Sequence, residues 1–326
     1  MTPSPPVRMS KRPPGAWRRV AGFLILVATL AIGVYCLELA IPKRDYFLER
    51  KGQLARIEVL EQQIPYAAGQ TVQLEASTGL LVDLRVLRPL TRAGERLPTI
   101  VVIGGERTGK DAVDLVGVPL GVAYVALDYP YHGDQELDAF WESVTAIPSV
   151  QQAFLDSPPA LSLSLDWLED QDWFDPTRVE LVGVSLGVPF AAAAGALDAR
   201  FTRVWLLHGG ADNVQWVMHA GRRYIENETL RGLAARGALF VVYGNSFRTS
   251  RWIREIPPRP LVVVAAMNDD FVPAAARQAF IDAAARGDAE IVWTEGMHIR
   301  PNRRDELGQL LDIVLSRIDG AEGGVH

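Results

Sequence analysis

The chain has 326 residues, of which 48% are hydrophobic and 22% are charged, and its formal net charge is −6. These proportions are typical of a folded protein with a hydrophobic core and exclude a disordered chain, and the negative charge gives no electrostatic basis for binding nucleic acid. The one cysteine, Cys36, lies in the N-terminal apolar stretch, so the remainder can form no disulfide or thiolate metal site and contains no cysteine nucleophile.

The first forty residues predict a membrane anchor. Residues 1–19 form a Pro- and Arg-rich tail that we expect to be disordered. Residues 20–42 are almost entirely apolar, and about 20 such residues in a helix span the roughly 30 Å hydrocarbon core of a bilayer. A cleaved signal peptide is the alternative, but this apolar region is longer than a usual signal core and no small-x-small cleavage site follows it.

The charges on either side of the anchor predict its orientation. Basic residues in the tail favour a cytoplasmic N-terminus, although Lys43 and Arg44 directly after the span reduce this bias. We therefore expect a single-pass membrane protein whose folded domain lies outside the cytoplasm, in the periplasm or outside the cell.

The next segment, residues 43–66, is predicted to be a stalk or linker between the anchor and a folded domain. Its apolar residues recur at spacings of three and seven residues, which favours a short helix. These residues are Phe47, Leu54, Ile57 and Leu60.

From residue 67 to residue 320 the pattern predicts a sheet covered by helices. The strand-like runs at 71–76 and 80–87 predict an antiparallel hairpin at the edge of that sheet. Six short, almost continuous apolar runs follow, as expected for parallel strands that are buried on both faces. They are residues 99–105, 122–129, 179–184, 203–210, 260–267 and 290–296.

Helical patterns alternate with these runs, for example at Leu161–Asp170 and Ala274–Arg286. This alternation predicts an α/β fold with a mostly parallel, doubly wound sheet. Residues 212–257 are more than one crossover helix needs, so we expect them to form a small helical insertion that is a candidate lid.

A nucleophile-elbow motif follows the run at 179–184. The segment Gly183-Val184-Ser185-Leu186-Gly187 has the G-x-S-x-G pattern, in which the serine sits on a sharp strand-to-helix turn and both glycines avoid a collision. A buried strand precedes the motif and a helix of small residues follows it, as the motif requires. Ser185 is therefore the candidate nucleophile, and a Gly-rich turn with an inactive serine is the alternative.

A nucleophilic serine needs a base, and the base needs an acid that orients it. Asp269 and Asp270 follow the run at 260–267, and His298 follows the last run. Because parallel strands end at the same edge of a sheet, these side chains are expected beside the elbow, in the chain order Ser, Asp, His. The other histidines fit the base less well by position; they are His132, His208, His219 and His326.

With these motifs, the chain resembles the α/β-hydrolase superfamily, in particular bacterial esterases and dienelactone-hydrolase-like members. The resemblance covers about residues 70–318 and includes the D-x-x-V-P turn at 269–273 and the G-x-H-x-x-P turn at 296–301. It implies Ser185 as nucleophile, His298 as base and Asp269 as acid, because in this family the acid lies four residues before the proline. Asp270 could instead cap the helix that begins near Pro273.

The tetrahedral intermediate of such a reaction requires two N–H donors that form an oxyanion hole. We expect one from Leu186, directly after the nucleophile, and the second from Gly105, with Glu106 as the alternative. The sequence departs from the family here, because Ile103-Gly104 replaces the usual His-Gly and Glu106 occupies a position where small residues are common. A carboxylate facing the developing negative charge would oppose catalysis, so Glu106 must point away or the pocket is unusual.

The sequence therefore predicts a membrane-anchored serine hydrolase that cleaves an ester-type bond in a small molecule through an acyl-enzyme. A peptidase or thioesterase with the same triad remains open, as does a non-catalytic hydrolase-like scaffold at the membrane. We expect no cofactor and no metal. Lys110 is followed by Asp111 rather than the Ser or Thr of a phosphate-binding loop, and no His, Asp or Glu group has convincing metal-ligand spacing. The oligomeric state is not predicted.

Overall fold

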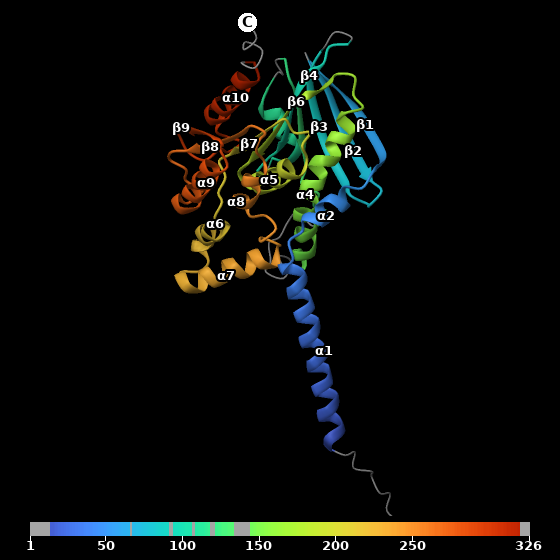
Figure 1. Ribbon diagram of the computed structural model, residues 1–326, viewed down its shortest axis with the longest axis vertical. Coiled ribbons are helices and arrows are strands. Elements are labelled where there is room, and N and C mark those ends of the chain that lie inside the picture. Colours follow the sequence, from blue (N-terminus) through green and yellow to red (C-terminus); the bar gives the residue numbers. More distant parts are fainter. Residues whose placement is uncertain are drawn as a thin grey trace, which may run out of the picture. The chain divides into compact units, whose positions relative to one another are not determined.

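The computed structural model describes residues 14–65, 67–90, 94–105, 108–117, 121–133 and 144–319. The chain divides into two compact units, Met1–Ile41 and Pro42–His326 (Figure 1). In the first unit, α1 (Pro14–Ala40) is one continuous helix. Its stretch Phe23–Ala40 is long and apolar enough to cross a membrane, and an N-terminal signal sequence would have the same properties.

The second unit is built on a nine-stranded sheet with the order β1-β2-β3-β5-β4-β6-β7-β8-β9. The first three strands and the β3–β5 pair are antiparallel, and the remaining neighbours are parallel. The predicted α/β fold with a mostly parallel sheet is confirmed. The strands are β1 (Leu54–Ile64), β2 (Ala67–Ala76), β3 (Leu81–Pro89), β4 (Leu97–Ile103), β5 (Ala123–Leu127), β6 (Phe174–Val184), β7 (Arg203–Leu207), β8 (Leu261–Ala266) and β9 (Glu290–Thr294).

Helices cover both faces of the parallel strands, which explains the almost continuous apolar runs. Leu181 and Val204, on neighbouring strands, lie against Gly195 of α5 (Val188–Leu197). The next residue on each strand points to the opposite face. There Val182 and Trp205 join the buried cluster that includes Leu310 of the last helix. The covering helices are α4 (Ile147–Leu168), α5, α9 (Ala274–Arg286) and α10 (Arg304–Asp319).

The insertion between β7 and β8 is helical, as predicted for residues 212–257. Its elements are α6 (Asn213–Ala220), the 3₁₀ turn η3 (Gly221–Arg223), α7 (Glu228–Val241), α8 (Thr249–Trp252) and the 3₁₀ turn η4 (Ile253–Glu255). In Figure 1, α6 and α7 lie at the lower end of the domain, below α8 and α9. Two further 3₁₀ turns, η1 (Gly109–Leu115) and η2 (Ser185–Gly187), follow β4 and β6.

The structure differs from the helical stalk expected over residues 43–66. A helix, α2 (Arg44–Lys51), ends at Gly52, and β1 then pairs with β2 along its whole length. The apolar spacing of three residues was misleading, because ladder hydrogen bonds to β2 decide the conformation here. The hairpin predicted at 71–87 is confirmed as β2–β3, but β1 rather than this hairpin forms the edge of the sheet.

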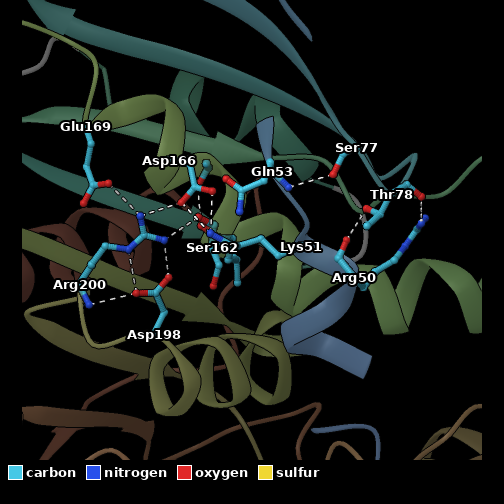
Figure 2. A network of polar contacts seen from close by, with 12 residues as sticks. Arg50, Lys51, Gln53, Ser77, Thr78, Ser162, Asp166, Glu169, Asp198 and Arg200 are labelled. Atoms are coloured by element: carbon cyan, nitrogen blue, oxygen red, sulfur yellow. Dashed lines mark hydrogen bonds and ion pairs between the residues drawn. The ribbon is translucent and has the colours of Figure 1, made fainter. Parts of the chain in front are cut away.

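Ion pairs hold α2 against the folded domain. Arg50 Nε lies 2.8 Å from a carboxylate oxygen of the buried Asp156, and Lys51 Nζ lies 2.7 Å from Asp166. Figure 2 shows the network in which Asp166 also binds Arg200, at 2.7 Å. Helix α2 is therefore part of the folded unit rather than a free stalk.

Candidate active site

Ser185 lies at the sharp turn between β6 and α5. Its φ of 54° is in the left-handed region, which a non-glycine residue adopts only where the surroundings impose it. The two motif glycines leave the space that this turn needs: a Cβ at Gly183 would collide with Ala191, and one at Gly187 would collide with the carbonyl oxygen of Ile103. The backbone therefore has the geometry that the G-x-S-x-G pattern predicts.

The structure brings Ser185, His298 and Asp269 into one hydrogen-bonded series. Ser185 Oγ lies 2.9 Å from His298 Nε2, and His298 Nδ1 lies 2.9 Å from Asp269 Oδ2. The serine is 9% exposed and the histidine 3% exposed. The three residues follow the ends of β6, β8 and β9, as expected from the meeting of parallel strand ends at one edge.

Asp269 is held as an ionised acceptor. Its Oδ1 accepts hydrogen bonds from the backbone N–H groups of Phe271, at 2.9 Å, and Val272, at 2.6 Å. Burial raises the pKa of Asp269, but the hydrogen bond and charge of His298, together with the two N–H donors, outweigh burial and leave the pKa below its usual value. The carboxylate therefore presents a negative oxygen to His298.

Asp270 has different hydrogen-bond partners from those of Asp269. Its Oδ1 accepts the backbone N–H of His298 at 3.1 Å, and its carboxylate pairs with Arg300 and Arg303. The hydrogen bond from Arg303 is the main reason why the pKa of Asp270 lies far below its usual value. The alternative that Asp270 caps α9 is wrong, because that helix starts after Pro273 without a side-chain cap.

His208, at the end of β7, supports the loop that carries the candidate base. Its Nδ1 accepts the N–H of Ile299 at 3.0 Å, and its Nε2 lies 3.2 Å from Thr294 Oγ1. Burial first, and then the nearby His298, lower the pKa of His208 to about 4. A neutral ring with the proton on Nε2 satisfies both contacts. Sequence reasoning placed His208 near the site but did not reveal this role, because its partners lie on β9 and beyond.

Two of the expected oxyanion-hole residues border the nucleophile. A Cβ built on Gly105 would lie 3.9 Å from Ser185 Cβ, and both Gly105 and Leu186 line the pocket at the serine. An ion pair holds the segment that follows this loop: Lys110 Nζ lies 2.6 Å from Asp128 Oδ2. Glu106, the residue that departs from the family pattern, lies outside the described residues.

Comparison with known proteins identifies the fold. No protein-family model matches the chain, and no curated protein matches it. Solved structures do match. An acetyl xylan esterase from Paenibacillus sp. R4 is 15% identical, with a TM-score of 0.57 over 83% of this chain and 92% of that protein. Acetyl xylan esterase 1 from Thermoanaerobacterium sp. JW/SL YS485 is also 15% identical, with a TM-score of 0.56 over 82% and 92% of the two chains.

A hypothetical protein from Pseudomonas aeruginosa also has a similar structure, with 17% identity and a TM-score of 0.56 over 82% of this chain and 99% of that one. The chain has the α/β-hydrolase fold. At this level of identity the comparison establishes the architecture alone.

In this α/β-hydrolase fold, a pocket of about 1140 Å³ opens at Ser185 and His298. Most of its wall is apolar. An aromatic series leads along one side: the ring of Phe271 lies 4.9 Å from that of His298 and 5.9 Å from that of Trp216 on α6. The site can therefore exclude water from a bound apolar group while the serine stays accessible.

One group of candidate metal ligands occurs among the described residues, formed by His208, Asp269 and His298. Both ring nitrogens of each histidine already have a hydrogen-bond partner. A metal ion would have to replace the contacts between Ser185, His298 and Asp269, so these donors fit proton transfer better than metal binding.

Proposed function

We propose that the protein is a serine hydrolase that cleaves ester bonds in small molecules through an acyl-enzyme, with Ser185, His298 and Asp269 as its triad. The observation that carries this proposal is the buried hydrogen-bonded series from Ser185 Oγ to Asp269, with 2.9 Å at both steps. Two matched structures that share the fold are described as acetyl xylan esterases, which supports an ester as the substrate.

The reaction follows from this arrangement. Ser185 Oγ bonds to the ester carbonyl carbon while its proton passes to His298 Nε2. The carbon–oxygen bond to the leaving group then breaks, and His298 returns the proton to the departing alcohol. In the second half, His298 removes a proton from water, the hydroxide bonds to the acyl carbon, and the acid leaves as Ser185 recovers its proton.

Charge stabilisation accompanies each step. The N–H groups of Leu186 and Gly105 donate to the carbonyl oxygen as it becomes negative, and loss of one such donor typically costs about 3–4 kcal/mol. Asp269 stabilises the positive charge that His298 gains, and its depressed pKa keeps it ionised for this purpose. No cofactor or metal is required by this scheme.

We further propose that residues 20–42 anchor the protein in a membrane in a single pass, with the hydrolase domain outside the cytoplasm. The apolar helix α1 supports the anchor, and the basic tail supports the orientation. The helical insertion at 212–257 is proposed to be the lid of the pocket, since Trp216 and Leu239 form part of the pocket wall.

A fluorophosphonate probe tests the proposed chemistry directly. The full chain in detergent should be labelled and should hydrolyse 4-nitrophenyl acetate, whereas Ser185→Ala should do neither. The parallel loss of both signals separates a nucleophilic serine from an adventitious surface reaction. A folded protein that neither labels nor hydrolyses esters would instead support the non-catalytic scaffold. Labelling without ester turnover would direct the search to thioesters and peptides.

A further inference from the structure

The pocket extends from Ser185 in two directions. One part runs between the sheet and α10, but its residues Leu310 and Val314 belong to the buried core cluster. The other part lies under the insertion and is lined by Trp216, Leu239 and Val242, which are only partly buried. The part under the insertion, with its less buried lining, is the part that a substrate can reach from solvent.

This part of the pocket opens at α7. Ala238 lines the pocket and is exposed at the surface as well, so the pocket reaches the surface beside that helix. Further along α7, Leu230 is 59% exposed and Leu233 62% exposed. Exposed large apolar side chains on a helix that borders an apolar pocket fit a surface that meets an apolar phase.

The chain connection limits how far the proposed anchor can be from the residues that follow α7. Only residues 41–43 separate α1 from α2, and four steps of extended chain reach no more than about 14 Å. Lys43 enters the folded domain beside the end of α7: its N–H donates to Ser246 Oγ at 3.2 Å, and its Nζ lies 5.1 Å from the Tyr243 ring centroid. If α1 spans the bilayer, the chain keeps Lys43, and the residues after α7 that it contacts, within reach of the bilayer surface.

We propose that the substrate is an ester of a long apolar chain, drawn from the membrane, whose chain lies in the pocket under α6 and α7. The inference rests on the proposed esterase function and on the proposed anchor, and it deepens both. The part of the pocket under the insertion is lined by the apolar side chains of Trp216, Leu239 and Val242, which can bury a long apolar chain. Each buried methylene raises affinity by up to about fourfold.

A pair of substitutions on α7 tests the position of the chain. Ala238→Trp fills the pocket, while Ala234→Trp, one turn earlier, adds the same side chain at an exposed position outside the pocket wall. With the full chain in detergent, we measure kcat/KM for 4-nitrophenyl acetate and 4-nitrophenyl decanoate. The decanoate-to-acetate ratio should fall by at least about fifteenfold in Ala238→Trp, equivalent to two lost methylene contacts, and stay unchanged in Ala234→Trp.

A second pair of variants tests the membrane as the source of the substrate. Leu230→Ser/Leu233→Ser removes the apolar surface of α7, and Leu60→Ser is the control, since Leu60 is 67% exposed on the edge strand β1. Proteins reconstituted in phosphatidylcholine vesicles hydrolyse 4-nitrophenyl hexadecanoate from the bilayer and 4-nitrophenyl butyrate from solution. The hexadecanoate-to-butyrate ratio should fall by about fivefold in the double variant and stay unchanged in Leu60→Ser.

The outcomes separate the parts of the proposal. Two results would overturn the long-chain substrate while leaving the esterase function intact. One is a wild-type enzyme with the same kcat/KM for the acetate and the decanoate ester, and the other is the same decanoate-to-acetate ratio in Ala238→Trp and Ala234→Trp. A preference for long chains with no effect of the double variant would overturn the membrane source. Absence of fluorophosphonate labelling at Ser185 would mean that the proposed function itself has failed.

Discussion

The substitution Asp269→Asn gives the sharpest test of the triad, because its effect can be derived from the contacts of one side chain. Oδ1 of Asp269 accepts two backbone N–H groups, from Phe271 and Val272, while Oδ2 faces His298 Nδ1. In asparagine, the remaining oxygen will keep the two N–H donors, so the NH₂ group must face Nδ1. Since two donors cannot bond to each other, His298 has to place its proton on Nε2.

In that tautomer His298 cannot accept the proton of Ser185, because Nε2 is already protonated. An equivalent change in a serine protease lowers kcat by about 10⁴-fold, which corresponds to about 5 kcal/mol of transition-state stabilisation. We expect a loss of about 10³- to 10⁴-fold in kcat/KM for 4-nitrophenyl acetate at pH 8, with little change in the denaturation midpoint.

Asp270→Asn is the matched control, since it changes the adjacent residue in the same way. Asparagine can still accept the N–H of His298 through its oxygen and loses only the half-exposed ion pairs with Arg300 and Arg303. The expected loss of activity is within about tenfold. If Asp270→Asn lost as much activity as Asp269→Asn while both stayed folded, the assignment of the acid and the tautomer argument would be refuted.

Three further predictions concern stability and the anchor. Folding lowers the pKa of His208 from 6.5 to about 4, so below pH 6.5 the unfolded chain binds more protons than the folded chain. The free energy of unfolding should therefore fall by about 3 kcal/mol as the pH is lowered to 4. Urea titrations at several pH values should show a weaker pH dependence in His208→Gln. Gly187→Ala should prevent folding because its Cβ meets the Ile103 carbonyl, whereas Gly308→Ala, where a Cβ meets no atom, should raise stability by about 0.5–1 kcal/mol in thermal melts. The purified protein should keep its full-length mass and resist carbonate extraction from membranes, and deletion of residues 14–40 should release it; a shorter mature chain would instead identify a signal peptide.

The sequence predicted the parallel strands well because burial on both faces leaves a clear composition signal. The run at 261–266, for example, consists only of Leu, Val and Ala, and all six residues are buried. It also placed Ser185 at the strand-to-helix turn, because G-x-S-x-G describes a local backbone geometry. A sequence pattern is enough to predict the structure of a segment in two cases: when local interactions determine its backbone, and when all of its residues are buried in the same environment.

The failures involve partners that are distant in the sequence. Residues 54–64 form a strand because β2 supplies their ladder hydrogen bonds, and spacing along the segment does not contain that information. In the same way, the part played by Asp270 depends on His298, which lies 28 residues further along, and that of His208 depends on Ile299, 91 residues away. Side-chain acceptors of this kind cannot be recognised before the loops are brought together.

These two acceptors explain how the candidate base is positioned at the end of a strand. Beyond β9 the backbone N–H groups of His298 and Ile299 have no neighbouring strand to pair with, yet buried donors need acceptors. Asp270 accepts the first and His208 accepts the second, so residues that follow β8 and β7 fix the loop from two sides. The position of His298 relative to Ser185 therefore depends on an oxygen acceptor of the Asp270 side chain and on a His208 imidazole that must stay neutral. Burial, and then the nearby His298, lower the pKa of His208 to about 4, so its ring stays neutral at neutral pH.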